Sequence, residues 1–262
     1  MEGRKKVDLK DVTFVIPIKI DSTERKENLH LICDYLLWHF DTNILIGEHC
    51  ARPLLDPVLF EGSGIKCIFI QSASELFHKT RVLNILVKAA ETPYVCIYDA
   101  DVLMRREQYM DAVDDLRKNK ADVIYPFNGS FLDIDRLYVE QIRNSNMSLY
   151  MLSDKNFCIL SNNSPGGAFF IKKESWDSVG GGNENFRSWG WEDNEFFYRF
   201  QRLGLRLKRS PGVIYHVSHP RGINSSPGTP HSIKNKEEYD KVLAMTEEDL
   251  RSYIQSWKGE TK

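Results

Sequence analysis

Short apolar segments alternate with segments of helical periodicity over the first hundred residues, and this alternation constrains the fold more than any other feature. Strands are expected at residues 12–18, 43–50, 65–71 and 94–98. One helix is expected behind the cap candidates Ser22 and Thr23, and a second at 80–91. Nearly all-apolar strands separated by helices predict a parallel sheet covered on both faces. This part of the chain therefore has the pattern of a nucleotide-binding α/β half.

The remainder of the chain is less regular. A helix at about 106–119 and a strand at 122–127 lead into the irregular segment 128–164, and loops of that length are usually functional or mobile. The expected elements after it are a strand at 167–173, a helix at 192–204 with Gly204 as its C-cap, and strand character at 206–219. The tail predicts two acidic amphipathic helices, the second with a capping box from Thr246 to Asp249. They could pack on the core, form a dimer or, least favoured by their charge, face a membrane.

Composition excludes several classes of protein. A chain of 262 residues with 42% hydrophobic residues can bury one substantial core. The net charge of −2 gives no broad basic field, so nucleic acid is not an expected partner. No apolar run reaches the length of a membrane span. The cysteines are scattered without a CxxC pair, which favours reduced core thiols over disulfides or a zinc site: Cys33, Cys50, Cys67, Cys96 and Cys158.

Two carboxylates follow the apolar strand 94–98. Asp99 and Asp101 lie just past its end, where open parallel sheets bind ligands. Residues two apart in extended backbone point the same way, so both carboxylates could face one site, where a divalent cation would relieve their repulsion. Oxygen ligands of this kind favour Mg²⁺ or Mn²⁺. For a lone D-x-D, an ordinary polar turn after a strand is the better explanation, so the motif needs support from other residues.

The segment 164–200, SPGGAFFIKKESWDSVGGGNENFRSWGWEDNEFFYRF, places glycines, tryptophans and acids immediately ahead of a predicted helix. Taken singly, Glu192 and Asp193 could be acids of a helix start, and Trp189 and Trp191 could be core residues. The run as a whole resembles the GG…GG…F…WGWED signature of inverting GT-A glycosyltransferases in the β-1,4-galactosyltransferase and chondroitin-polymerase group.

Earlier segments are similar to the same family in the same order. FHKTRVLN (77–84) resembles the family's F-N-R-A-x-L-L-N segment, and YDADV (98–102) falls on its D-x-D position. VIPIKIDSTERKENL (15–29) resembles its V-P-F-R-x-R-x-x-H-L opening. The resemblance implies an α/β GT-A fold, with a Rossmann-like nucleotide-binding half and a mixed central sheet flanked by helices. It also implies a catalytic domain over 1–222, with halves at about 12–127 and 128–222, and a helical C-terminal extension at 223–262.

The resemblance implies metal-dependent, inverting transfer of a sugar from a UDP-sugar to a hydroxyl of a glycan or glycolipid. Asp101 would hold Mn²⁺ or Mg²⁺, which stabilises the UDP leaving group. Asp193 would be the general base, kept ionised by the dipole of the helix that it begins. Glu192 would hold donor or acceptor hydroxyls, and Trp189 would pack against sugar. Retaining polypeptide N-acetylgalactosaminyltransferases carry Asn after this Glu, so the aspartate favours inversion.

The same resemblance assigns the remaining ligands. His219 would bind the metal, with His216 as a second ligand in place of the galactosyltransferase Met, and Asp99 would orient the ribose. The other donor-binding residues would be Pro17, Lys19 and Asp21 around uracil and ribose, Arg25 close by, Lys79 and Arg81 near the diphosphate, and Gly167. The Gly166-Gly167 pair and the Gly180-Gly181-Gly182 run would let backbone approach the donor or let a loop close over it, with tight turns as the plain alternative.

The chain departs from the family pattern in three places. Ile18-Lys19 replaces Phe-Arg and is followed by an insert, and Trp191 replaces a glycine of the W-G-G-E-D form, which could alter donor or acceptor choice. The third departure is a polar N-terminus in place of a Golgi-type anchor. It suggests a bacterial enzyme of capsule or lipopolysaccharide synthesis, in the cytoplasm or peripheral to the inner membrane. Whether the chain forms a homodimer stays open.

Two other classes of function compete with this interpretation. A catalytically silent glycan- or nucleotide-sugar-binding domain of GT-A type would be expected to lose Asp101 or Asp193, and neither is lost. A metal-dependent phosphohydrolase would be expected to show a denser set of Asp and His ligands.

Overall fold

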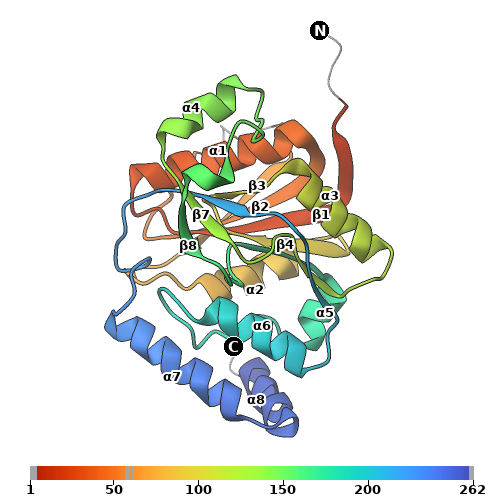
Figure 1. The fold of residues 1–262 in the computed structure, drawn as a ribbon. Coiled ribbons are helices and arrows are strands. Elements are labelled where there is room, and N and C mark those ends of the chain that lie inside the picture. The colour runs from red at the N-terminus through yellow and green to blue at the C-terminus, as the bar shows by residue number, and fades with distance from the viewer. Residues whose placement is uncertain (1–4, 57–59, 61, 260–262) are drawn as a thin grey trace.

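One mixed sheet forms the centre of the molecule. The computed structural model describes residues 5–56, 60 and 62–259, and within them seven strands pair in the order β10-β6-β9-β4-β1-β2-β3 (Figure 1). These strands are β1 Val7–Ile18, β2 Phe40–Cys50, β3 Ile65–Gln71, β4 Tyr94–Tyr98, β6 Val123–Tyr125, β9 Ala168–Lys172 and β10 Leu207–Arg209. Strands β3, β2, β1 and β4 are parallel, whereas β9 runs antiparallel to β4 and β6. The expected mixed α/β architecture is confirmed.

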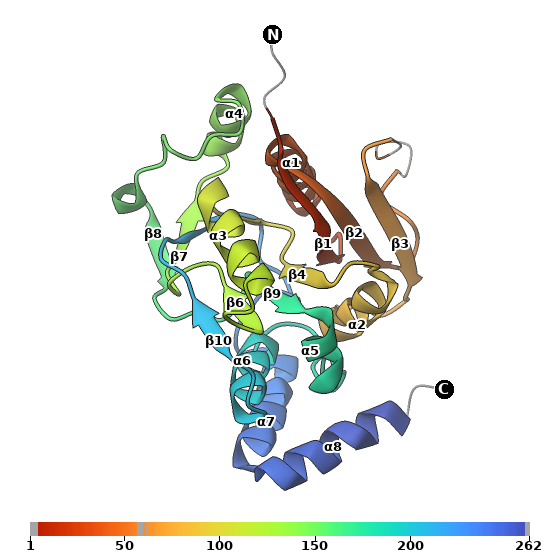
Figure 2. The same cartoon turned by 90° about the vertical axis from the view of Figure 1, so that its right-hand side faces the viewer.

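Helices cover both faces of this sheet. Figures 1 and 2 show α1 (Thr23–His39) and α3 (Arg106–Arg117) on one face, and α2 (Lys79–Ala89), α5 (Lys173–Ser178) and α6 (Glu192–Arg202) on the other. Both faces are thus withdrawn from water, which explains why the last seven residues of β1 and of β2 are all buried. The predicted cap of α1 is confirmed, because the Ser22 side chain accepts a hydrogen bond from the Arg25 backbone N–H.

A second, smaller sheet was missed by the sequence interpretation. Its order is β5-β11-β7-β8, from β5 (Val102–Leu103), β11 (Ile214–Val217), β7 (Phe131–Ile134) and β8 (Cys158–Ser161). Between β7 and β8 lie α4 (Leu137–Asn144) and a turn of 3₁₀-helix at Asp154–Asn156. Strands of two to four residues are too short to show periodicity, so 128–164 resembled a loop.

The C-terminal helices pack on α6, as Figure 2 shows. Helix α7 (Pro230–Ala244) begins at Pro230, because Thr229 caps it and Pro230 occupies its first position. Helix α8 (Glu247–Gly259) begins at the predicted Thr246–Asp249 capping box. The two helices meet α6 in a second apolar cluster built from Val242, Leu250 and Ile254 with Tyr198 and Leu203. No helix in the described ranges is long and apolar enough to cross a membrane.

Several sequence interpretations need correction here. The Gly180-Gly181-Gly182 run fits the tight turn given as its plain alternative, since Gly180 and Gly181 have φ +86° and +72°. It also serves packing, because a Cβ on Gly180 would meet Ile254 Cγ2 of α8 at 2.2 Å and one on Gly182 would meet the Thr80 carbonyl at 3.1 Å. Cys158 is exposed on β8, so it is not a core thiol, although all five cysteines are free. Leu203, not Gly204, is the C-cap of α6; the glycine follows it with φ +81°.

Candidate active site

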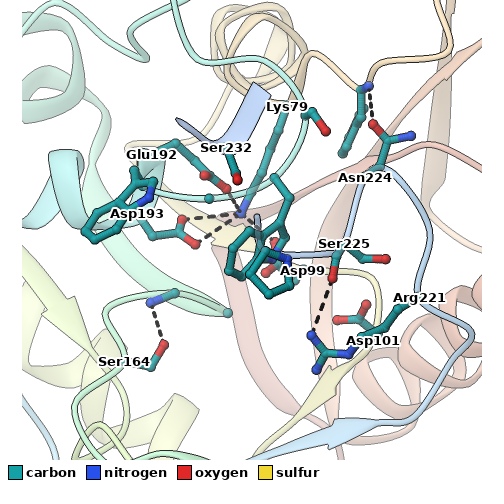
Figure 3. A pocket seen from close by; sticks show the side chains of 18 of the residues that line it. Lys79, Asp99, Asp101, Ser164, Glu192, Asp193, Arg221, Asn224, Ser225 and Ser232 are labelled. Carbon is teal, nitrogen blue, oxygen red and sulfur yellow. Dashed lines mark hydrogen bonds and ion pairs between the residues drawn. The ribbon is translucent and has the colours of Figure 1, made fainter. Parts of the chain in front are cut away.

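A cleft of about 940 Å³ opens beyond the carboxyl ends of β1 and β4 (Figure 3). Every residue predicted for the site lines it except Asp21 and Arg81. Asp21 lies instead in an adjoining cleft of about 510 Å³, where its Oδ1 atom forms an ion pair with Arg25 Nε at 2.8 Å. The two clefts share Lys19, Arg221 and Asn224 as lining residues. One continuous depression therefore holds nearly all of the predicted donor, metal and catalytic residues.

The prediction for Arg81 is not supported by its position. Its side chain is exposed on α2 and lines neither cleft. Lys79 begins the same helix and does line the main cleft. Two residues along an α-helix correspond to a rotation of about 200°, so both side chains cannot face one ligand. Of the two α2 residues predicted to lie near a diphosphate, Lys79 faces the cleft and Arg81 does not.

Asp101, His216 and His219 form a cluster whose ligand atoms all lie within 4.8 Å of one another. The Asp101 Oδ2 atom is 3.3 Å from His219 Nε2 and 3.9 Å from His216 Nε2. The other ring nitrogens are engaged elsewhere, His216 Nδ1 with the Asp133 carboxylate at 2.7 Å and His219 Nδ1 with the Pro220 carbonyl at 2.8 Å. Both imidazoles consequently present Nε2 to one carboxylate, the arrangement that metal-ligating histidines use.

The small sheet brings these residues together. Strand β5 follows Asp101 directly and pairs antiparallel with β11, which places Val102 opposite His216. The Val217 N–H donates to the Asp101 carbonyl at 2.8 Å, which fixes the turn after β4 to the same strand. Asp101 and His216 are more than a hundred positions apart, and they meet because the two-residue strand β5 pairs with β11.

Charge around the cluster favours an ionised carboxylate. Burial opposes ionisation of Asp101, but His219, His216 and Arg25 together hold its pKa well below the usual range. Burial likewise opposes a charged His216, yet the carboxylates of Asp133 and Asp101 raise the pKa of that imidazole. With two imidazoles and a carboxylate as donors, the set suits Mn²⁺ at least as well as Mg²⁺.

Asp99 belongs to a different group, centred on Lys79. The Lys79 ammonium lies 3.0 Å from Asp99, 3.3 Å from Glu192 and 3.3 Å from Asp193 (Figure 3). Burial disfavours this charge, but the three carboxylates raise the pKa of Lys79 well above its usual value. The two aspartates of the D-x-D therefore line one cleft with different partners, because strand β4 ends at Tyr98 and the chain turns between them.

The expectation that Asp193 has an ordinary, dipole-stabilised carboxylate is wrong. Burial beside Glu192 and Asp99 raises its pKa to about 7, although the Lys79 ammonium acts in the opposite direction. Desolvation and two like charges thus outweigh the favourable field of the α6 N-terminus. A carboxylate with a pKa near neutrality is a stronger base than a typical one and is still available in its ionised form.

Glu192 and Gly166 are also part of the surroundings of Asp193, the predicted general base. The Glu192 Oε2 atom is buried and has no hydrogen-bond partner among the described residues. An unpaired carboxylate oxygen in a cleft is an acceptor for a ligand hydroxyl. Gly166 lies against Asp193, because a Cβ at position 166 would be 2.5 Å from Asp193 Oδ2. Gly167 has φ +91°, and a Cβ on it would meet Phe131 at 2.7 Å, so both glycines are required by close approach.

Trp191 occupies a backbone position that suits glycine. It has φ +74°, and such a conformation costs a side-chain-bearing residue roughly 1–2 kcal/mol. Its indole stacks on Tyr239 of α7 with ring centroids 5.3 Å apart, and Lys236 Nζ lies 4.9 Å from the indole centroid. The departure from the glycine of the family pattern is thus compensated by the C-terminal helix.

Sequence reasoning missed the part of the cleft that lies beyond residue 222. Asn224 bridges to the opposite loop, where its side chain accepts from the Phe77 N–H and donates to the Glu75 carbonyl. Cleft residues from α7 are Ser232, Ile233, Lys236 and Glu237. Asp133, the partner of His216, was also missed. None of these positions carries a motif; the Asn-Ser-Ser-Pro-Gly turn at 224–228 was the one local signal.

Comparison with known proteins agrees with this geometry. Residues 148–221 match the family model described as the N-terminal domain of galactosyltransferase, a stretch that contains Asp193, His216 and His219 but only about a quarter of the chain. A search of curated proteins finds no match.

Solved structures resemble the whole fold at low identity. Similar chains include GalNAc-T7 with UDP, GalNAc and Mn²⁺, at 14% identity and a TM-score of 0.60, over 88% of this chain and 48% of that one. A mutant Drosophila β1,4-galactosyltransferase 7 with manganese, UDP-Gal and xylobiose gives 12% and 0.54, over 88% and 79%. S. aureus TarS gives 12% and 0.51, over 79% and 60%. The fold is that of the GT-A glycosyltransferases. The chain spans about half the length of the GalNAc-T7 chain.

Proposed function

We propose that this protein is a metal-dependent, inverting glycosyltransferase that moves a sugar from a UDP-sugar to a glycan hydroxyl. One observation carries the proposal: a carboxylate–histidine cluster and a buried acid with a pKa near 7 line the same cleft. The first suits a divalent cation with a diphosphate, and the second suits removal of a proton from an acceptor. The galactosyltransferase family match supports the same chemistry.

Asp101, His216 and His219 would hold the metal. GalNAc-T7 was crystallised with UDP, GalNAc and Mn²⁺, and the mutant β1,4-galactosyltransferase 7 with manganese and UDP-Gal, and the donor set here fits that ion. When bound, a divalent cation stabilises the negative charge that collects on the diphosphate leaving group. Asp133 would keep His216 oriented with Nε2 toward the site.

The donor would extend from the metal cluster into the adjoining cleft. That cleft, at the ends of β1 and β3, offers Lys19, Asp21 and Ser22 to a nucleoside, while Pro17 and Arg25 lie between it and the metal residues. Lys79 is the cation placed to neutralise the diphosphate, and Asp99 is available to the ribose or, through water, to the metal residues. Glu192 Oε2 would accept a sugar hydroxyl.

Asp193 would act as the general base. The acceptor oxygen attacks the anomeric carbon on the face opposite the diphosphate, and its proton passes to the Asp193 carboxylate. The bond from the anomeric carbon to the phosphate oxygen breaks, and its electron pair leaves with UDP. Attack from the opposite face inverts the anomeric configuration. Trp189, which is 37% exposed in the cleft, offers an aromatic face to the sugars.

The first test measures thermal unfolding with UDP, with Mn²⁺ and with both. Saturation at about a hundred times the dissociation constant adds roughly 2.7 kcal/mol of stability, so a larger shift with both than with either alone is expected. UDP release is then measured with UDP-linked galactose, N-acetylgalactosamine, glucose, N-acetylglucosamine and glucuronic acid, with methyl glycosides of galactose, glucose, xylose and N-acetylglucosamine as acceptors. Proton NMR of the product should show an inverted anomeric centre; a retained one would refute the proposed mechanism.

The same measurements distinguish an active transferase from a catalytically silent domain. Such a domain would be stabilised by UDP or by a UDP-sugar but would release no UDP from any donor, with or without acceptor. Absence of any thermal shift would contradict both proposals, because each requires a nucleotide site.

A further inference from the structure

One side chain of α7 holds the loop that carries Trp189. We name residues 183–191, immediately ahead of α6, the tryptophan loop. Asn235 of α7 is 2% exposed, and its Nδ2 donates to the carbonyls of Arg187 at 3.0 Å, Trp189 at 3.2 Å and Gly190 at 3.0 Å. Its Oδ1 accepts from the Arg187 N–H at 3.2 Å. All four hydrogen bonds of this amide go to the backbone of one loop.

Further contacts on the same side of α7 reach the tryptophan loop. Glu238 Oε1 accepts from Asn183 Nδ2 at 2.8 Å and from Asn185 Nδ2 at 3.3 Å. Tyr239 stacks on Trp191. Positions 235, 238 and 239 follow the i, i+3, i+4 spacing of one helix face, so α7 lies along the loop with a continuous surface.

The neighbouring face of α7 lines the cleft. Ser232, Ile233 and Lys236 line it together with Trp189. Ile233 is 55% exposed and Trp189 37% exposed, so both leave apolar surface open to a ligand. Apolar and aromatic surface beside hydroxyl and ammonium groups fits a neutral sugar, whose C–H face packs on rings while its hydroxyls bond to polar groups.

We propose that Asn235 is a positioning residue for transfer: it fixes the tryptophan loop to α7, and the resulting wall of Trp189, Ser232 and Ile233 receives the acceptor sugar. This inference rests on the function proposed above and specifies which segment of the chain selects the acceptor. Helix α7 is also held at its other end, where Val242 packs with Leu250 and Ile254 of α8. Loss of Asn235 should therefore release the loop without releasing the helix.

Amide hydrogen exchange of the unliganded protein tests the positioning step. Asn235→Ala removes all four hydrogen bonds, and Asn235→Ser keeps one short donor. Lys234→Ala is the matched control, because Lys234 is the neighbouring residue of α7, exposed and outside the cleft. Exchange at residues 187–191 should become at least about tenfold faster in Asn235→Ala, to a smaller extent in Asn235→Ser, and not in the control. Unchanged exchange in Asn235→Ala would overturn the proposal.

Kinetics tests the link to the acceptor. The donor is the UDP-sugar of the five above that the wild type hydrolyses fastest, and the acceptor is the methyl glycoside that it uses best. In Asn235→Ala, Mn²⁺-dependent UDP affinity and donor hydrolysis without acceptor should stay within about twofold of wild type, while the acceptor KM rises about tenfold. An unchanged acceptor KM, or an equal loss of hydrolysis, would overturn the inference while the proposed function stands. A wild type that releases no UDP from any donor would instead defeat the proposed function.

Discussion

Asp193 behaves unlike an isolated aspartate side chain. Its pKa of about 7 follows from burial beside two other carboxylates, with Lys79 as the partial counterweight. Because the ionised form is the base, kcat/KM for transfer should fall about tenfold for each pH unit below 7 and level off above it. A pH series from 5 to 9 measures this limb. Asp193→Asn should lower transfer by about a hundredfold or more and abolish the limb, with UDP affinity unchanged; a wild-type profile that is flat down to pH 5 would contradict this role.

Gly166 controls where that base stands. An added methyl group would lie 2.5 Å from Asp193 Oδ2, and the carboxylate can move away more readily than the backbone can. Gly166→Ala should therefore lower kcat by about tenfold or more while the denaturation midpoint changes little. Mn²⁺-dependent UDP binding provides the control, since Gly166 contacts none of the metal residues. Equal losses of stability and activity would mean that the glycine is structural.

Asp133 controls the orientation of His216. The carboxylate accepts from Nδ1 at 2.7 Å and so leaves Nε2 for the metal. Asp133→Asn should weaken Mn²⁺ affinity by about 10- to 100-fold, the usual effect of losing such a partner. Titration of Mn²⁺ in the presence of saturating UDP measures it. Asp135→Asn, two residues along the same segment, is the matched control, because Asp135 lies outside the cleft and hydrogen-bonds only locally.

At the scale of elements, α6 contains a buried ion pair between two of its own residues, Glu195 and Arg199. Arg199 is fully buried, with its Nε 2.5 Å from Glu195 Oε1 and with its other nitrogens donating to the Val179 and Gly181 carbonyls. Arg199→Ala leaves the Glu195 charge buried and unpaired, which should cost about 3–5 kcal/mol of unfolding free energy. Urea denaturation measures the loss.

A second variant separates the charge from the packing. Arg199→Met with Glu195→Gln removes both charges and keeps much of the volume, so it should recover part of the stability. If the double variant were no more stable than Arg199→Ala, the loss would come from the carbonyl and aromatic contacts of Arg199 rather than from the unpaired carboxylate.

Element by element, the sequence is most informative where periodicity is long. The strands 65–71 and 94–98 coincide with β3 and β4. The buried strand β4 is apolar throughout and ends before the polar Asp99, whereas β3 is an edge strand with half-buried and exposed residues and ends at the polar Gln71. The small sheet was missed since β7 and β8 have four residues each, with the polar residues Asp133 and Ser161 among them. The metal residues and acids were predicted from their motif. Asn235 and the cleft face of α7 were not, because their role exists only through contacts across the fold.

At the scale of the whole molecule, the cleft brings together many segments that are distant in the sequence. Among its lining residues, Pro17 lies in β1, Asp101 in the turn after β4, Asp193 at the start of α6 and Lys236 in α7. The chain passes between the two sheets several times, and the shortest of these connections, the turn from β4 to β5, carries Asp101. Residues 148–221, which match the galactosyltransferase model, thus supply the base and the histidines, while the aspartate of the cluster comes from the other half.

This arrangement bears on when the protein becomes competent during its synthesis. A ribosome adds about 5–20 residues per second, so roughly 10–45 seconds separate the appearance of Pro17 from that of Lys236. The parallel strands β1 to β4 are complete early and can begin to assemble, but the wall provided by α7 is translated long after them. A nascent chain could hold the nucleotide-side residues well before it could hold an acceptor, and ribosomes that stop early would release chains with a half-built cleft.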